Sequence, residues 1–125
     1  MSPILRHFEL NVYQLAHDGA LLIFDISESF DVDQESLLVD RLRRSSRAVY
    51  SGIADAWKHR LYEAAFSSKL IGAEAMAAET QTWLRFATER GYLQRNRSNH
   101  LLALYDKIID EIIQMITDPD PWLLP

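Results

Sequence analysis

The stretch LLVDRLRRSSRAVYSGIADAW, at residues 37–57, decides how the rest of the chain folds. Its apolar and small residues recur at the three- and four-residue spacing of an amphipathic helix, and one face carries Leu38, Leu42, Ser45, Val49, Ile53 and Ala56. Arg43, Arg47 and Lys58 lie roughly opposite. Gly52 costs a helix about 1 kcal/mol relative to alanine, which predicts that close packing or bending requires it. We therefore predict a helix over about residues 33–57 with a core face and a basic face.

The same periodicity continues on both sides of this helix and predicts three more, over about residues 9–29, 61–90 and 99–117. Asp31 and Asp33 are candidate N-caps for the second helix, and Ser98 or Asn96 for the fourth. Gly91 is placed to end the third helix. Neither glycine nor proline separates the second pattern from the third. We still predict a tight turn near residues 58–59, because an uninterrupted helix would be unusually long.

Four helices with short connections, and no strand pattern, predict an all-α protein: an antiparallel up-and-down four-helix bundle in one domain, residues 1–125. The first and third helices carry apolar residues on two faces, which predicts self-association into a homo-oligomer. The apolar tail, residues 118–125, is expected to dock on its own bundle or on a neighbour. The predicted subunit interface contains Tyr13, Leu21, Phe24, Phe66, Leu70, Trp122 and Leu123.

Composition narrows the class of protein. The 125 residues are 48% hydrophobic and 25% charged, which is typical of a globular domain, and there is no cysteine for disulfides or thiolate metal sites. The N-terminal residues lack the pattern of a signal peptide, and charged residues interrupt every apolar stretch before it reaches membrane-spanning length. We expect a cytoplasmic protein without a membrane partner. The net charge of −5 argues against a surface that is basic throughout.

The sequence contains no arrangement typical of catalysis or metal binding. No histidine follows a carboxylate at the Glu-x-x-His spacing of di-iron bundles, and zinc-protease, phosphate-loop and nucleophile-elbow motifs are absent. Asp55 and His59 have ligand-compatible helical spacing, but two residues at a solvated helix end are a weak signal. We predict no enzymatic activity, no metal and no cofactor.

Glu79 falls on the apolar side of the third helix, where an unpaired carboxylate is costly. Arg43 or Arg44 is the predicted partner, in a structural ion pair that sets the register of the bundle. The alternative is a catalytic carboxylate.

Five basic residues gather around the second helix: Arg43, Arg44, Arg47, Lys58 and Arg60. Such a patch can follow a phosphate backbone and release counterions. It can equally be a solvated face, or pair with acidic residues of another subunit. Among nearby aromatic residues only Tyr50 and Trp57 are interleaved with these cations, which disfavours stacking on single-stranded bases.

Residues 42–56, LRRSSRAVYSGIADA, resemble the Leu-Arg-Arg-(small)-(small)-x-x-Ile-Pro-x-Asn-Ile-Ala-Glu-Gly segment of the four-helix-bundle proteins associated with 23S rRNA intervening sequences. The family's opening is matched by Phe8, Leu10, Val12, Tyr13, Gln14, Ala16 and His17. Its later segments are matched by Glu79, Thr80, Gln81, Ala87, Gly91, Tyr92 and Leu93. Departures from the pattern are Tyr50 for proline, Gly52 for asparagine, Asp55 for glutamate, Ala56 for glycine and Tyr13 for tryptophan. The resemblance covers about residues 8–116.

The resemblance implies a homopentamer of four-helix bundles that acts as a non-enzymatic assembly or interaction module. Relatives include accessory proteins of diversity-generating retroelements, which bind a reverse transcriptase and nucleic acid through a strongly basic surface. The alternative prediction is therefore an RNA- or DNA-binding accessory protein that uses the patch on the second helix. It ranks lower because this chain is acidic overall.

Overall fold

The structure is a computed structural model that describes residue 4, residues 6–30 and residues 32–125, without the side chains of residues 32–35. A short 3-10 helix, η1 (His7–Glu9), precedes four α-helices: α1 (Asn11–Ser27), α2 (Val32–Trp57), α3 (Glu63–Glu89) and α4 (Arg95–Thr117). The described residues contain no strand, so the all-α prediction is confirmed.

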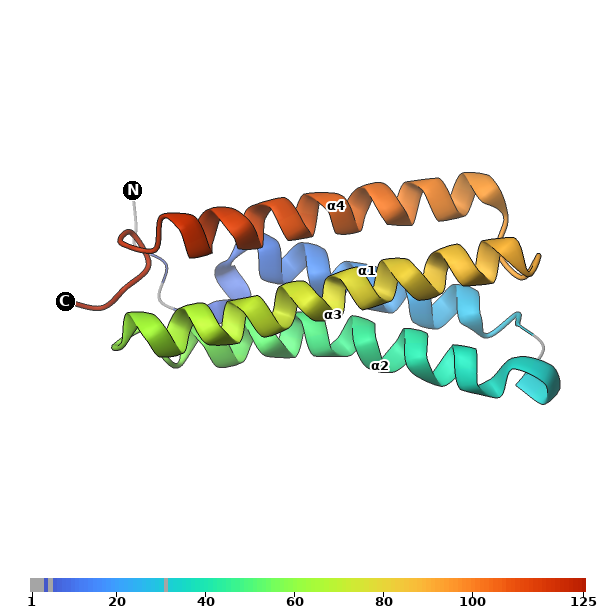
Figure 1. Cartoon of the computed structure of the whole chain (residues 1–125), viewed down its shortest axis with the longest axis horizontal. Coiled ribbons are helices and arrows are strands. Elements are labelled where there is room, and N and C mark those ends of the chain that lie inside the picture. The colour runs from blue at the N-terminus through green and yellow to red at the C-terminus, as the bar shows by residue number, and fades with distance from the viewer. Residues whose placement is uncertain (1–3, 5, 31) are drawn as a thin grey trace.

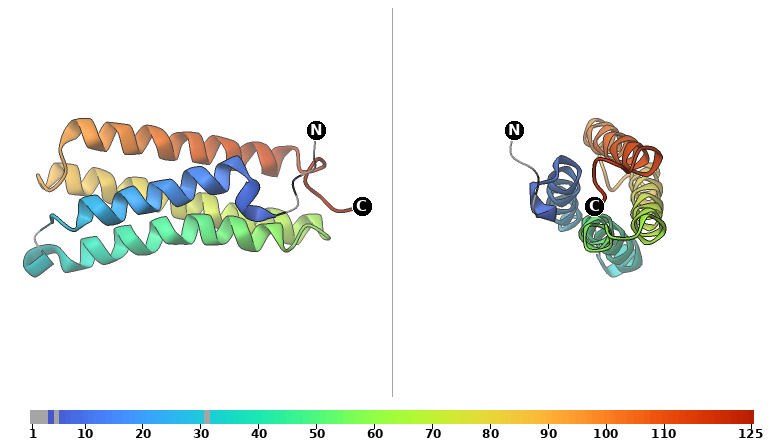
Figure 2. Two further views of the ribbon diagram at one scale, coloured as in Figure 1. Left: turned by 180° about the vertical axis from the view of Figure 1, so that it is seen from behind. Right: turned by 90° about the vertical axis from the view of Figure 1, so that its left-hand side faces the viewer.

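The four helices lie side by side along the long axis of the molecule (Figure 1). Seen along that axis they surround a common interior (Figure 2). α1 packs against α2 and α4, and α3 packs against the same two helices, so α1 and α3 lie diagonally across the bundle. The connection between α2 and α3, the short helix η1 and the C-terminal tail lie at the same end of the bundle (Figures 1 and 2).

The core consists of apolar side chains from all four helices. Leu42, Val49 and Ile53 of α2 are fully buried, as the pattern of residues 37–57 predicts. They join a single apolar cluster whose other large buried members are Ile23, Phe66, Leu70, Leu84, Ile108 and Ile112. Each such side chain stabilises the fold by roughly 1.5–3 kcal/mol relative to exposure in water.

The α2–α3 contact is very close at Gly52. A Cβ atom built on Gly52 would lie 3.2 Å from the Cβ atom of Ala73 in α3. Further along the same contact, the buried hydroxyl group of Thr80 donates a hydrogen bond of 2.9 Å to the Ser45 hydroxyl. Of the two predicted reasons for a glycine at residue 52, close packing or bending, the contact with Ala73 supports close packing.

The first helix is shorter than predicted. Leu10 has extended backbone angles, φ −67° and ψ 132°, and separates η1 from α1, so Glu9 lies outside the helix. The Gln14 side chain donates a hydrogen bond to the carbonyl oxygen of Phe8, which holds this bend. At the other end, the Ser27 hydroxyl bonds to the Phe24 carbonyl as α1 ends. Because apolar residues continue at helical spacing beyond both ends of α1, the sequence pattern did not predict where this helix begins and ends.

The boundaries of the later helices agree with the sequence in part. Gly91, with φ 81°, follows α3 as predicted, and the Tyr92 amide bonds to the Ala87 carbonyl in a Schellman motif. α4 begins at Arg95, earlier than predicted, because Gln94 is its N-cap residue and the first turn includes Asn96 and Ser98. The capping prediction for these two residues is therefore wrong. That for Asp31 and Asp33 lies outside the described side chains.

A tight connection, residues 58–62, separates α2 from α3, as predicted. The tail returns to this connection. The Trp122 ring meets the Trp57 ring edge-on, with 6.3 Å between centroids, and the Leu124 amide donates a hydrogen bond to the Arg60 carbonyl. Of the two predicted alternatives, the tail docks on its own bundle.

Candidate interaction surfaces

An exposed apolar face on α1 is the first candidate surface. The side chains of Leu21 and Phe24 are 54% and 43% exposed, although both are large and apolar. They border a small cleft of about 90 Å³ between α1 and α2, whose remaining lining is His17, Ala20, Arg43, Arg47 and Tyr50. Exposed apolar area of this kind is typical of a contact surface.

Arg43 is held against this face. Its guanidinium carbon lies 4.0 Å from the centroid of the Phe24 ring. Its Nε donates to the Ser27 hydroxyl at 2.8 Å, and a terminal nitrogen donates to the Phe24 carbonyl at 3.2 Å. These contacts hold the Arg43 guanidinium of α2 beside the Phe24 ring of α1.

Four aromatic or imidazole rings continue the α1–α2 contact toward η1. Tyr50 packs edge-on against Tyr13 and His17, with ring centroids 5.8 Å and 5.3 Å away, and His7 packs against Tyr13 at 5.0 Å. Sequence reasoning found only Tyr50 of this cluster near the arginines, because Tyr13, His17 and His7 come from other segments. The second apolar face of the first helix, which contains Tyr13 and Phe24, was the available sequence signal. It does not show that these rings lie beside Tyr50 and the arginines, because that depends on how α1 docks on α2.

The five predicted basic residues do not form one patch. Arg43 and Arg47 border the α1–α2 cleft. Arg44 forms an exposed ion pair of 3.1 Å with Asp40. Lys58 and Arg60 follow the end of α2 at Trp57, roughly 15 Å further along the axis than Arg47. The structure therefore divides the predicted surface into two separate basic regions.

The predicted ion pair of Glu79 is not formed by either named arginine. Arg43 points toward α1 and Arg44 pairs within its own helix. Glu79 itself is only half-buried, so it does not require a buried counter-charge. The buried polar contact between α2 and α3 is instead the hydrogen bond between Ser45 and Thr80. The position of Glu79 on an apolar side of α3 wrongly predicted burial, because the other helices cover that side only in part.

Two residues of the predicted subunit interface are in the wrong place. Phe66 and Leu70 are 0% exposed inside the bundle, so neither can contact a partner. They belong to the face of α3 that meets the core, and the other apolar face points outward. Leu21 and Phe24 are exposed, whereas Tyr13, Trp122 and Leu123 are half-buried within this chain.

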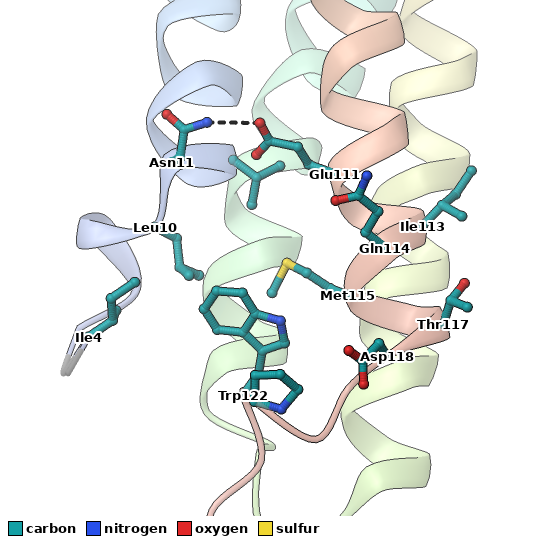
Figure 3. Close-up of a pocket in the computed structure, with 12 residues that line it drawn as sticks. Ile4, Leu10, Asn11, Glu111, Ile113, Gln114, Met115, Thr117, Asp118 and Trp122 are labelled. Carbon is teal, nitrogen blue, oxygen red and sulfur yellow. Dashed lines mark hydrogen bonds between the residues drawn. The ribbon is translucent and has the colours of Figure 1, made fainter. Parts of the chain in front are cut away.

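A larger cavity, about 700 Å³, opens between the start of α1 and the end of α4 (Figure 3). Leu10, Met115 and Trp122 form its apolar walls, while Glu111 and Asp118 bring carboxylates. Across it the Asn11 side chain donates a hydrogen bond of 2.8 Å to Glu111. Sequence reasoning missed this cavity, because it forms only where η1 bends away and the tail folds back.

Asp55, which the sequence places at a ligand-compatible spacing from His59, forms an ion pair with a lysine of α3. It forms a 2.9 Å ion pair with Lys69, and this hydrogen bond is the main reason why the pKa of Asp55 lies below its ordinary value. His59 lies 3.6 Å from the same carboxylate. Within the described residues, no three histidine, aspartate or glutamate side chains gather as a metal site, and none of the helices is long and apolar enough to cross a membrane.

Comparison with known proteins places the chain. A family model described as "23S rRNA-intervening sequence protein" matches residues 8–116. The chain belongs to this family. The match has the extent that the sequence motifs predict, and it includes α1, α2, α3 and all of α4 except its last residue.

A solved structure supports the same fold for this intervening-sequence protein. The crystal structure of a protein with unknown function from the S23 ribosomal protein family of Bacteroides thetaiotaomicron superposes with a TM-score of 0.76. The two chains are 21% identical, and the match covers 85% of this chain and 95% of the other. At this identity the likeness shows the fold alone. A search of curated proteins finds no match.

Proposed function

We propose that this member of the 23S rRNA-intervening sequence family is a non-enzymatic assembly module, an antiparallel four-helix bundle that forms a closed homo-oligomer. The observation that carries the proposal is the exposed apolar face of α1 at Leu21 and Phe24. Burial of such side chains between copies contributes about 25 cal/mol per Å² of apolar area. The resemblance to the family suggests five copies.

A second face supports a ring. The outward side of α3 carries an exposed strip without a charged residue, and it consists of Ala64, Ser68, Ile71, Ala75, Ala78, Thr82 and Phe86. Ile71 and Phe86 are 56% and 39% exposed, and the residues between them are small, so a neighbouring helix can approach closely. This strip and the α1 face are complementary in character, because the first offers shallow apolar surface and the second offers large apolar side chains.

The positions of the two faces favour a contact between unlike surfaces of successive copies. α1 and α3 lie diagonally in the bundle, so their outward faces lie on different sides of the molecule (Figure 2). When the α1 face of one copy meets the α3 strip of the next, the contact is heterologous, and such contacts close into a ring when each one also rotates the next copy. An isologous dimer would leave one of the two faces exposed.

The test is the mass of the protein in solution at micromolar concentration, by light scattering and native mass spectrometry. We expect an oligomer that Leu21→Glu converts to a monomer with unchanged helix content. Leu37→Glu is the matched control, because Leu37 is an equally exposed leucine outside both faces. A monomeric wild-type protein would refute the proposal.

A second candidate function is nucleic-acid binding by the α1–α2 cleft. Arg43 and Arg47 lie there beside Phe24 and Tyr50, which combines cations for phosphates with rings for base stacking. A protein using this cleft should bind single-stranded RNA or DNA with a strong dependence on salt. Arg47→Ala should weaken binding and reduce the salt dependence, whereas Arg85→Ala, which removes an exposed arginine from α3, should not. A reverse transcriptase as protein partner remains a prediction of the resemblance.

A further inference from the structure

A second cavity at the same end of the bundle has a different chemical character. Its volume is about 410 Å³, and three segments far apart in sequence form it: Arg6 to Phe8, Trp57 to Arg60, and the tail residue Leu124. The hydrogen bond from the Leu124 amide to the Arg60 carbonyl closes the tail over the connection between α2 and α3. Cavities of this size accommodate small organic ligands.

Among the described residues that line this cavity, every charged side chain is basic. Arg6, Lys58 and Arg60 contribute three cations, the imidazole of His7 lies among them, and none of these lining residues is an aspartate or a glutamate. Within the described residues, none of the three cations forms an ion pair with an aspartate or a glutamate. Burial without a counter-charge lowers the pKa of Arg60. An anion in the cavity would therefore meet positive charge that no carboxylate neutralises.

The cavity also has aromatic and apolar walls. Phe8, Trp57 and Leu124 line it. The Arg60 guanidinium lies 3.6 Å from the centroid of the Trp57 ring, and its Nε donates a hydrogen bond of 2.9 Å to the Trp57 carbonyl. This carbonyl belongs to the negative end of α2, which disfavours an anion, and the Arg60 contact offsets that effect. A cation and a ring are thus held together on one wall.

The neighbouring cavity between α1 and α4 serves as an internal comparison. It is larger and also apolar, but the charged residues that line it are the acidic Glu111 and Asp118. A ligand that sought only apolar surface would favour that larger cavity. A ligand with an anionic group would favour the smaller one.

We propose that the cavity formed by Arg6, Phe8, Trp57, Lys58, Arg60 and Leu124 binds a small organic anion that joins an aromatic body to one phosphate, sulfonate or carboxylate group. The anionic group lies by Lys58 and Arg6, and the aromatic body packs along Phe8 and Trp57. This site lies within one chain and does not depend on self-association, so it can fail or succeed independently of the assembly proposed above.

The test uses two fluorescent probes that share their rings and differ in charge: anilinonaphthalene sulfonate and neutral phenylnaphthylamine. The wild-type protein should bind the sulfonate more tightly. Lys58→Ala and Arg6→Ala should each weaken sulfonate binding about fivefold, the effect of losing one partly exposed charge contact, and leave the neutral probe unchanged. Phe8→Ala should weaken the binding of both probes, because it removes part of the shared apolar wall.

Matched controls separate the site from general charge and from the other cavity. Lys107→Ala removes an exposed lysine from α4 and should have no effect on either probe. Glu111→Gln changes the neighbouring cavity and should not alter sulfonate binding. Equal affinity for the two probes, an equal loss with Lys107→Ala, or stronger sulfonate binding with Glu111→Gln would each overturn the proposal. Lys58→Gln, which removes the charge but keeps more of the side chain than alanine does, should weaken sulfonate binding as much as Lys58→Ala; unchanged sulfonate binding by Lys58→Gln would overturn the role of the charge.

Discussion

The hydroxyl group of Tyr105 in α4 lies directly over Gly19 in α1. A Cβ atom at residue 19 would be 2.9 Å from this oxygen and 3.1 Å from the ring carbon that carries it. Tyr105 is 0% exposed, so its ring cannot turn away into solvent. The absence of a side chain at Gly19 therefore sets how closely α1 and α4 approach.

Gly19→Ala should destabilise the protein. Overpacking of a buried contact costs about 1–3 kcal/mol, and the gain in helix propensity of about 1 kcal/mol offsets only part of it. Gly72→Ala is the matched control, because no atom lies within 4 Å of a Cβ atom there and only the propensity gain remains. Urea unfolding curves should show opposite signs for the two variants. Stabilisation by both would contradict the close contact.

Tyr105→Phe should change how stability depends on pH. The Tyr105 hydroxyl is buried without a hydrogen-bond partner among the described residues, and burial raises its pKa above the ordinary value of 10.0. A raised pKa in the folded state means that the neutral hydroxyl stabilises the fold below about pH 10, and that this contribution is lost as pH rises further. The wild-type protein should therefore lose more stability than the phenylalanine variant between about pH 10 and pH 11. If melting curves showed that the two proteins lose the same stability in this alkaline range, the raised pKa of a buried Tyr105 hydroxyl would be contradicted.

Thr80→Val should cost about 1–2 kcal/mol of unfolding free energy, because it removes a buried hydroxyl that lies 2.9 Å from both the Ser45 hydroxyl of α2 and the Met76 carbonyl of its own helix. Thr82→Val provides the control, since the Thr82 hydroxyl is exposed and bonds only to the Ala78 carbonyl of its own helix. Thermal melting should distinguish the two variants. Equal midpoints would show that the contact between helices contributes nothing.

Mixing two variants should reveal whether the contact between copies is heterologous. Leu21→Glu disables the α1 face and Ala78→Glu the α3 strip, so each variant alone should be monomeric. Together they retain one intact pair of faces and should form a heterodimer that cannot grow. Native mass spectrometry of the mixture measures this directly. An Ala78→Glu protein that still assembles would favour contact through α1 alone.

The sequence predicted the four helices, the core face of α2 and the family, because apolar periodicity and specific short motifs carry that information. The roles of two glycines could be predicted from the sequence. Gly91 adopts the positive φ angle that ends α3, and Gly52 lies where α2 and α3 pack closely. The wrong predictions about α3 share one cause. Phe66 and Leu70 looked like a surface, and Glu79 looked buried, because periodicity shows that α3 has two apolar faces without showing which one meets the core.

The cavities and the aromatic cluster were beyond sequence reasoning for a different reason. Tyr50 finds Tyr13 and His17 only after α1 and α2 dock in one register. Arg6, Lys58 and Leu124 meet only because η1 bends at Leu10 and the tail folds back. These juxtapositions depend on the ends of helices, where periodicity carries the least information.

The cavity between α1 and α4 also has a consequence for dynamics. The α2–α3 contact is sealed by Gly52, Ala73 and a buried hydrogen bond, whereas the opposite side of the bundle contains about 700 Å³ of open space. Local opening follows the contacts that cost least to break. Amide hydrogens in the first turns of α1 should therefore exchange with solvent well before those in the middle of α2. We therefore expect the α1–α4 side of the bundle to open locally before the α2–α3 side does.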